Sequence, residues 1–181
     1  MLAVYIVIGV VLGLLIIALL LPGKYHVEKT TIIKKNVTDV MNKVADLTYY
    51  AAWNPWQQSD PSAKGTITGT PATAGHRYEW VGKKVGVGSL TIRDIDNKHV
   101  HFNLEFVKPF KSKASDDWLF EEWGNGETKV TWSNNGEFPF PVARLLGPSI
   151  TKGLHKSFVQ GLDNLRKMCE EGAIRRGGYE L

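Results

Sequence analysis

Hydrophobic and polar residues follow three successive patterns along the chain. Residues 2–21 form an apolar run, LAVYIVIGVVLGLLIIALLL. From residue 64 to residue 137, apolar and polar residues alternate with a period of two, which is typical of strands that face a core on one side. From residue 142 onward, apolar residues recur at the spacings of an amphipathic helix. The patterns predict an apolar helix, a series of strands and a final helix.

The apolar run has the length of a membrane-spanning helix, which needs about 20 predominantly apolar residues. Fifteen of residues 1–23 are Leu, Ile or Val, and none of the 23 is charged. At about −0.3 to −0.6 kcal/mol each, such residues favour insertion by roughly 4–9 kcal/mol in total. A signal peptide would carry basic residues before its apolar core and a small-x-small cleavage site after it. The sequence shows neither feature, so residues 1–23 are predicted to be an uncleaved transmembrane anchor.

The charges that flank the run predict its orientation. Lys24, Lys29, Lys34 and Lys35 follow it, and no basic side chain precedes it. Because basic residues accumulate on the cytoplasmic side of a span, we expect the N-terminus outside and the soluble domain in the cytoplasm. The single cysteine, Cys169, excludes an internal disulfide and agrees with a reducing compartment.

Composition also bears on the partners of the chain. Gly9 and Gly13 have the small-xxx-small spacing that supports pairing of membrane helices, so the sequence allows weak self-association through this helix. The net charge is +4 and the sequence pI is near 9.1, but the basic residues are scattered. We therefore expect no nucleic-acid partner, and attraction to anionic lipid beside the span explains the charge more simply.

Residues 24–171 are enough for one domain with a core of its own, and this domain is predicted to begin with a strand and two short helices. Residues 26–35 are rich in β-branched side chains and indicate the strand. Asn36 suits the N-cap of a helix, because apolar residues then recur at helical spacing. Residues 49–53 indicate a second short helix, which ends before Pro55 because the residue preceding a proline is driven out of the α region.

Six further strands are predicted from the alternating pattern. They cover residues 65–70, 76–81, 85–94, 99–107, 113–123 and 128–137. Gly124-Asn125-Gly126 supplies a tight hairpin turn before the last strand. Because Gly147-Pro148 interrupts the apolar pattern that follows, we expect a short helix and then a long one over about 149–171, before a flexible tail at 172–181. Strands followed by segregated helices predict the α+β class.

The order of elements and several segments resemble one known superfamily. The segments are YYAAWNPW after the first helix, GHRYEWVGKKVGVGSLTI in the middle of the sheet, TKVTWSNNGEFPFP, and the long last helix. Over residues 26–171 the chain resembles the SRPBCC superfamily, and within it the bacterial polyketide cyclase/dehydrase-like proteins, many of which carry an N-terminal membrane span. The resemblance implies the helix-grip fold of START lipid-transfer domains and the birch-pollen allergen. In that fold a curved antiparallel sheet, here of about seven strands, wraps around a long C-terminal helix and encloses a cavity for apolar ligands.

Candidates for this cavity are the aromatic residues of the chain and a few polar ones. Aromatic side chains suit a largely apolar pocket, and they suit a filled core equally well. His76 shares a strand face with Tyr78 and Trp80, and Arg144 enters the last helical region, where a ligand head group could be held. The cavity candidates are Trp53, Trp56, His76, Tyr78, Trp80, Phe102, Leu104, Trp118, Phe120, Trp132, Arg144 and Phe158.

Two motifs are expected to be structural. Trp53 and Trp56 flank Asn54-Pro55 and are predicted to be part of the wall, with a ligand gate or a membrane anchor as alternatives. Gly86-Val-Gly88 lacks the strand-to-helix context of a phosphate-binding loop. Glycines in a strand instead predict a bend or bulge, which a curved sheet needs.

No catalytic or metal-binding motif is recognisable in the sequence. His99 and His101 project to one face of their strand, and because the opposite face is apolar, both should point to solvent. The adjacent aspartates Asp116 and Asp117 point to opposite faces of a strand, do not form a two-carboxylate site, and are expected at a solvated edge. The sequence therefore indicates neither a cofactor nor a metal.

Three functions are consistent with these observations. The favoured one is a membrane-tethered domain that binds a lipid or other apolar small molecule in a helix-grip cavity. A cyclase or dehydratase acting on a hydrophobic, polyketide-like substrate would need at least two polar side chains that converge inside the pocket. A protein-binding stress or scaffold module would have a filled core and an exposed apolar patch.

Overall fold

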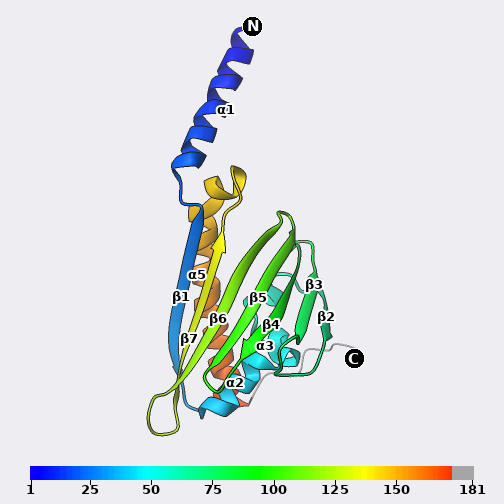
Figure 1. Ribbon diagram of the computed structural model, residues 1–181, viewed down its shortest axis with the longest axis vertical. Helices are drawn as coiled ribbons and strands as arrows, with labels where there is room; N and C mark the ends of the chain where they lie inside the picture. The colour runs from blue at the N-terminus through cyan, green and yellow to red at the C-terminus, as the bar shows by residue number, and fades with distance from the viewer. Residues whose placement is uncertain (173–181) are drawn as a thin grey trace.

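The computed structural model describes residues 1–172 and consists of an apolar helix joined to an α+β domain (Figure 1). The helices are α1 (Leu2–Leu20), α2 (Val37–Ala45), the 3-10 helix η1 (Leu47–Tyr49), α3 (Tyr50–Trp53), α4 (Pro55–Ser59) and α5 (Val142–Glu171). The strands are β1 (Lys24–Ile33), β2 (Lys64–Thr68), β3 (Arg77–Val81), β4 (Val87–Ile95), β5 (His99–Lys108), β6 (Ser112–Glu122) and β7 (Thr128–Glu137). Of the tail predicted at 172–181, only Gly172 lies within the described residues.

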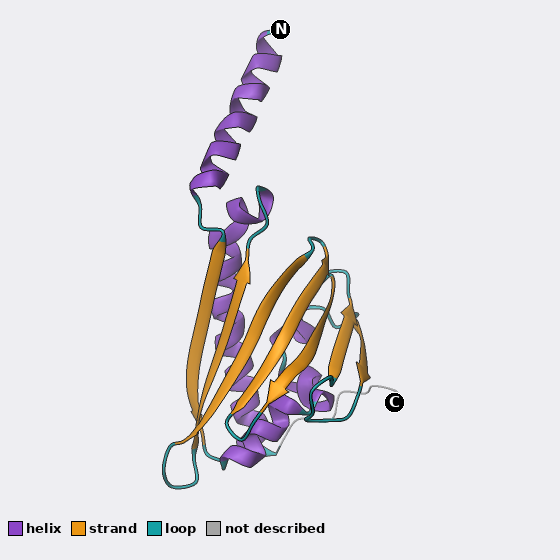
Figure 2. Ribbon diagram, in the orientation of Figure 1, coloured by secondary structure: helices purple, strands orange, loops and turns teal. Residues whose placement is uncertain are grey.

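The seven strands form one antiparallel sheet in the order β1-β7-β6-β5-β4-β3-β2. The first strand pairs with the last one, so β1 and β2 are the two edges of the sheet. The sheet curves, and α5 runs along one of its faces with the short helices beside it (Figure 2). The predicted α+β class and helix-grip fold are confirmed by this arrangement.

Glycines in the β3–β4 region give the sheet a bulge. The pairing of β4 with β5 shifts register between Val87 and Gly88. Gly86 has a φ of +71°, a conformation that favours glycine. A Cβ on Gly88 would lie 2.3 Å from the Trp80 ring and 2.5 Å from the carbonyl oxygen of Glu105, so this position has no room for a side chain. The bulge predicted from Gly86-Val-Gly88 is confirmed.

The last helix, α5, is continuous over 30 residues and is about 45 Å long at 1.5 Å per residue. The predicted break at Gly147-Pro148 is therefore wrong. Pro148 lacks one backbone amide near the start of the helix, which removes a single hydrogen bond without ending the helix. Gly147 is buried against Phe138, whose Cδ2 would lie 3.0 Å from a Cβ at this position. The glycine thus permits a close ring contact inside the helix.

Four short helical segments, α2, η1, α3 and α4, connect β1 to β2. Asn36 caps α2, as predicted, by accepting a hydrogen bond of 2.9 Å from a backbone amide in its first turn. The predicted second helix ends at Trp53, but Pro55 then opens α4, a helix that the sequence pattern did not predict. Asn54 accepts a hydrogen bond from the amide of Trp56 (2.9 Å), and Pro55 fills the first helical position, where no amide is needed.

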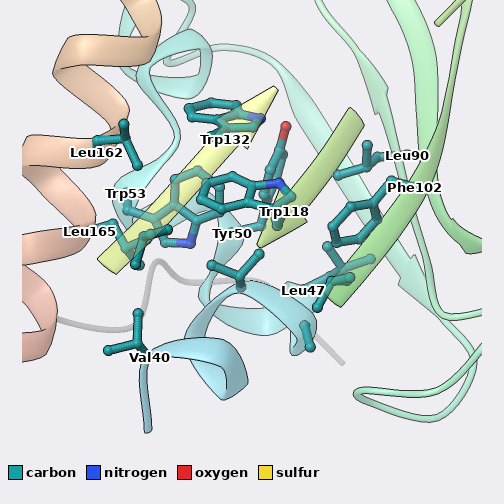
Figure 3. Close-up of a cluster of buried hydrophobic side chains, with 14 of the residues drawn as sticks. Val40, Leu47, Tyr50, Trp53, Leu90, Phe102, Trp118, Trp132, Leu162 and Leu165 are labelled. Carbon is teal, nitrogen blue, oxygen red and sulfur yellow. The ribbon is translucent and has the colours of Figure 1, made fainter. Parts of the chain in front are cut away.

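The core between the sheet, α5 and the short helices is built around stacked aromatic rings (Figure 3). The ring of Trp132 stacks on Trp118 at 4.5 Å and on Phe158 at 3.9 Å between centres. Trp53 meets Trp118 and Trp132 edge-on, at 5.4 Å and 5.8 Å. This cluster joins α3, β6, β7 and α5 into one hydrophobic unit.

The first helix, α1, projects away from the domain (Figure 1). Ala18 is its only buried residue. Three residues, 21–23, join it to β1, a reach of about 11 Å when extended. The length and composition of α1 are those of a membrane span, and a signal sequence has the same two properties.

Candidate functional site

A cavity of about 340 Å³ lies between the sheet, α5 and the short helices. Its wall is mainly aromatic and aliphatic, and α5 contributes Ile150, Leu154 and Phe158. The polar side chains that reach the cavity are Asn54, Gln57, Ser59, Lys84, Asp116 and Asn134. The arrangement can accommodate an apolar molecule with a small number of polar contacts.

Half of the residues predicted for a ligand cavity line this one. They are Trp56, Tyr78, Trp80, Leu104, Trp132 and Phe158. Four others, Trp53, Phe102, Trp118 and Phe120, belong to the filled core behind the cavity and are at most 1% exposed. Trp53 and Trp56 thus differ: Trp53 is a core residue, whereas Trp56 is half-buried and lines the cavity.

His76 also lies outside the cavity, buried between the short helices and the end of β2. Its Nε2 accepts a hydrogen bond from the backbone amide of Leu47 (3.0 Å). Because Nε2 is the acceptor, the ring proton is on Nδ1. Nδ1 donates it to the carbonyl oxygen of Thr68, at 3.1 Å. Both ring nitrogens are therefore used in joining two backbone segments, and this requirement turns the ring away from the cavity.

Arg144 is the sixth candidate outside the cavity, and it lies at the end of the domain next to α1. Its guanidinium fills the space beside Gly23, where a Cβ would be 2.8 Å from Nη2. The same group lies over the ring of Phe140, with Cζ 5.7 Å from the ring centre. The Nε atom is buried and has no hydrogen-bond partner within residues 1–172.

Asp116 is the main polar group of the cavity, and its predicted place at a solvated edge is wrong. The residue is only 6% exposed. Its Oδ1 accepts hydrogen bonds from Trp132 Nε1 (2.8 Å) and Asn134 Nδ2 (3.0 Å). Its Oδ2 accepts one from Trp118 Nε1 (3.1 Å). A carboxylate has about four acceptor positions, so three donors leave roughly one for a group in the cavity.

The surroundings of Asp116 shift the pKa of two groups. Burial raises the pKa of Asp116 from its ordinary 3.8 to about 6, against the opposing effect of its three hydrogen bonds. Burial, and secondly the charge of Asp116, raise the pKa of Tyr25 to about 12. The Tyr25 hydroxyl donates to Asn134 Oδ1 (2.9 Å), and Asn134 donates in turn to Asp116. A hydrogen-bonded chain of three side chains therefore lines this side of the cavity.

A signal for Asp116 is present in the sequence. Asp116, Trp118 and Phe120 alternate along β6 and so share its core face. Asp117 occupies the other face, where its Oδ1 lies 2.7 Å from Nδ1 of His101. Because Asp116 shares its face with Trp118 and Phe120, the period of two along β6 indicates that Asp116 points to the core.

The turn between β3 and β4 forms one side of the cavity through Lys84 and Val85. Asp60 holds this turn by accepting hydrogen bonds from the backbone amides of Lys84 (2.7 Å) and Val85 (3.3 Å). The hydrogen bond from Lys84 is the largest of the effects that lower the pKa of Asp60. On the inner wall, the Tyr78 hydroxyl donates to Gln57 Oε1 (3.1 Å). The polar groups on this side are thus tied to the framework of the domain.

The other titratable candidates do not reach the cavity. His99 lies on the face of β5 opposite the core. Its Nδ1 is 3.0 Å from Oδ2 of Asp96, which lies in the turn before β5. Cys169 is buried near the end of α5, and burial raises the pKa of its thiol to about 11, so it is protonated at neutral pH. Within residues 1–172 no group of three or more His, Cys, Asp or Glu side chains is placed to hold a metal ion.

Many solved structures are similar to the domain. The Zhui aromatase/cyclase from Streptomyces sp. R1128 is 16% identical, with a TM-score of 0.63 over 86% of this chain and 99% of that one. Protein MLL2253 from Mesorhizobium loti is 12% identical, with a TM-score of 0.62 over 83% of this chain and 100% of that one. TTHA0849 from Thermus thermophilus is 17% identical, with a TM-score of 0.60 over 83% and 100%. These likenesses show a shared fold. No curated protein matches the chain.

A family model covers almost the whole domain. Residues 24–170 match the family described as polyketide cyclase / dehydrase and lipid transport. The match begins at the first residue of β1 and ends within the last turn of α5, so it includes the sheet, the short helices and the cavity. The chain therefore belongs to the polyketide cyclase / dehydrase and lipid transport family.

Proposed function

We propose that this protein is a membrane-tethered domain that holds a lipid or another apolar small molecule in its cavity. The observation that supports the proposal is the cavity of about 340 Å³, which has an aromatic and aliphatic wall and a polar side at Asp116 and Asn134. Ligand pockets in proteins range from about 300 to 1,000 Å³ and combine an apolar lining with a few orienting polar groups. A filled core, as expected for a scaffold module, would lack such a space.

The tethering part of the proposal follows from α1. This helix carries no charged residue, and Ala18 alone of its residues is buried. Exposing so much apolar surface to water is unfavourable at about 25 cal/mol per Å², whereas a bilayer would cover it. The lysines that follow α1 favour a cytoplasmic location for the domain.

A cavity-filling substitution tests ligand binding. The full chain is purified in detergent, and bound small molecules are identified by mass spectrometry. Binding of the apolar fluorescent probe N-phenyl-1-naphthylamine to residues 24–181 in detergent-free buffer is then compared between two variants of α5. Leu154→Trp, at a residue that lines the cavity, should abolish binding. Val159→Trp, at a position 57% exposed on the same helix, should leave it unchanged. Equal probe binding by both variants, with no co-purifying molecule, would refute the proposal.

A cyclase or dehydratase is a second candidate, favoured by the hydrogen-bonded chain of Tyr25, Asn134 and Asp116. A carboxyl with a pKa of about 6 can accept and return a proton near neutral pH. In an aldol-type ring closure, the carboxylate would take a proton from a carbon beside a carbonyl group. That carbon would then attack a second carbonyl carbon, and the carboxylic acid would return the proton to the alkoxide formed.

This second function has its own test. A synthetic poly-β-ketone with an aliphatic chain is incubated with the full chain, and ring formation is followed by absorbance. If the protein is an enzyme, Asp116→Asn should abolish turnover and still bind the apolar probe. Absence of turnover in the unmodified protein would leave the binding function alone.

A further inference from the structure

The strand directions place several connecting segments at the end of the domain nearest α1, here called the proximal end (Figure 1). β1 starts at this end and runs away from it. Because all neighbouring strands are antiparallel, β7, β5 and β3 finish there. The turns at 82–86 and 109–111, and the segment 138–141 that leads into α5, therefore lie at the same end as α1.

Exposed apolar side chains gather at the proximal end. On α5, Val142, Leu146 and Ile150 are four residues apart, share one face of the helix, and are 46%, 47% and 39% exposed. Phe140, just before the helix, is 46% exposed. The tip of the β5–β6 hairpin adds Val107 and Phe110, which are 51% and 46% exposed.

The same end carries basic side chains with few acidic ones. Lys83 and Lys84 lie on the β3–β4 turn, and Lys108 and Lys111 lie at the tip of the β5–β6 hairpin; all four are exposed. Glu137, at the end of β7, is 3.8 Å from Lys24. Two further acidic residues near these turns are also paired: Glu105 is 2.8 Å from Lys113, and Glu79 is 3.0 Å from Arg77. Asp60 is buried and accepts hydrogen bonds from the turn's own amides. The proximal end is therefore positively charged.

Arg144 adds a half-buried guanidinium to this end of the domain. It lies on the first turn of α5 between Gly23 and Phe140, and its buried Nε has no hydrogen-bond partner within residues 1–172. A guanidinium binds a phosphate through two parallel hydrogen bonds. The position next to the end of α1 is where lipid phosphates would lie if α1 spans a bilayer.

We infer that the proximal end docks on an anionic lipid surface, with Phe140, Leu146, Ile150 and Phe110 entering the interface and the lysines and Arg144 contacting phosphates. This inference rests on the proposed attachment of α1 to a membrane. The connection of three residues holds the proximal end against that membrane, and basic residues near an anionic surface are attracted to it. Lys84, Val85 and Ile150 line the cavity as well, so the docked end is also the end through which a ligand would pass.

The test uses residues 24–181 without α1. We expect this part to fold by itself, because the family match covers residues 24–170 and α1 contributes just one buried residue. Flotation is measured with vesicles of phosphatidylcholine, with and without phosphatidylglycerol. Binding should require the anionic lipid. The double variant Lys108→Glu/Lys111→Glu should weaken it by at least about tenfold.

Matched variants separate docking from a general charge effect. Lys34→Glu/Lys98→Glu makes the same charge change at exposed positions at the opposite end, and it should bind as the unmodified domain does. Leu146→Asp should reduce binding, whereas Val159→Asp, farther along α5, should not. No binding to anionic vesicles, or equal loss in the two lysine variants, would overturn the inference.

The outcome can be told apart from failure of the proposed function. Probe binding to the cavity is measured in detergent-free buffer and needs no vesicle, so it can succeed where docking fails. Carbonate extraction of the full chain from membranes reports on α1 alone. Flotation of residues 24–181 reports on the proximal end alone, because that part lacks α1.

Discussion

The indole nitrogen of Trp132 lies 2.8 Å from Oδ1 of Asp116, and the rings of Trp118 and Phe158 both stack against that indole. A buried carboxylate is costly unless its oxygens are hydrogen-bonded. Here two indole groups and one amide provide the hydrogen bonds, in place of a basic side chain. The stability of the domain should therefore depend on each of these donors.

Replacing Trp132 with Phe keeps an aromatic ring and removes one donor to Asp116. We expect the free energy of unfolding to fall by about 1–3 kcal/mol, because a buried acceptor loses a partner. Urea unfolding monitored by circular dichroism measures the change. Trp123→Phe, at a position 53% exposed, is the control and should shift stability by less than about 0.5 kcal/mol. Equal losses in both variants would show that the hydrogen bond contributes nothing.

The raised pKa of Asp116 predicts how stability varies with pH. The pKa is about 6 in the folded protein, against an ordinary value of 3.8. Between these values the folded state binds a proton more tightly than the unfolded state does. The contribution of Asp116 to stability is thus largest at pH values below 3.8, and it is lost as the pH rises through about 6. Its full size is on the order of 3 kcal/mol, at about 1.4 kcal/mol per pKa unit.

The variant Asp116→Asn should lose this dependence, because its side chain does not titrate. The measurement is the difference in unfolding free energy between the unmodified protein and the variant, taken at several pH values. Other carboxyl groups cancel in this difference. As the pH rises from 3.8 to about 6, the unmodified protein should lose stability relative to the variant. A difference in unfolding free energy that stays constant with pH would contradict a buried, weakly acidic Asp116.

Two glycines of α5 should respond in opposite ways to replacement by alanine. A Cβ on Gly161 would lie 2.8 Å from the Trp132 ring and 3.2 Å from Cδ of Pro55, whereas nothing lies within 4 Å of a Cβ on Gly153. Gly153→Ala should raise the free energy of unfolding by about 0.5–1 kcal/mol through helix propensity. Gly161→Ala should lower it by about 1–3 kcal/mol through overpacking. Chemical denaturation compares them, and two stabilised variants would mean that the ring has room to move.

Trp53 and Trp56 should behave differently when replaced by alanine. Trp53 is 1% exposed in the aromatic core, so Trp53→Ala should cost about 3–5 kcal/mol of stability. Trp56 lines the cavity, so Trp56→Ala should weaken binding of the apolar probe in a domain that remains folded. Thermal unfolding and a fluorescence titration measure the two effects. Identical behaviour of the two variants would contradict the distinction between core and cavity wall.

The pattern of burial made most of the fold predictable from the sequence. The predicted last strand, residues 128–137, coincides with β7, because its alternating residues face the core and the outside in turn. On β5, Val100 and Phe102 are buried, while His99 and His101 lie on the other face, as the period of two predicted. Such patterns need no knowledge of partners distant in sequence.

Prolines were less informative, because their effect depends on where a helix begins. The sequence pattern predicts that helices end at Pro55 and Pro148, yet Pro55 opens α4 and Pro148 lies within α5. Asn54 could have indicated the new helix, since an Asn before a proline suits an N-cap. No local signal showed that Gly147 contacts Phe138, because that contact depends on the path of the chain between β7 and α5.

The cavity could be predicted only in part. Trp118 and Trp132 are cross-strand neighbours with the same pattern of surrounding residues, yet only Trp132 lines the cavity. Which ring meets empty space is decided by how α5 and α4 approach the sheet, for example through the close contact of Gly161 with Trp132. That approach depends on packing between distant segments, which periodicity in the sequence does not encode.

The contact between Arg144 and Gly23 affects how α1 can rotate relative to the domain. Because the guanidinium occupies the space beside Gly23, rotation of this connection about its own axis would have to displace the Arg144 side chain. This contact favours one orientation of the domain about the axis of α1. A larger residue at position 23 would displace the guanidinium and remove this preference, even with α1 and the domain intact.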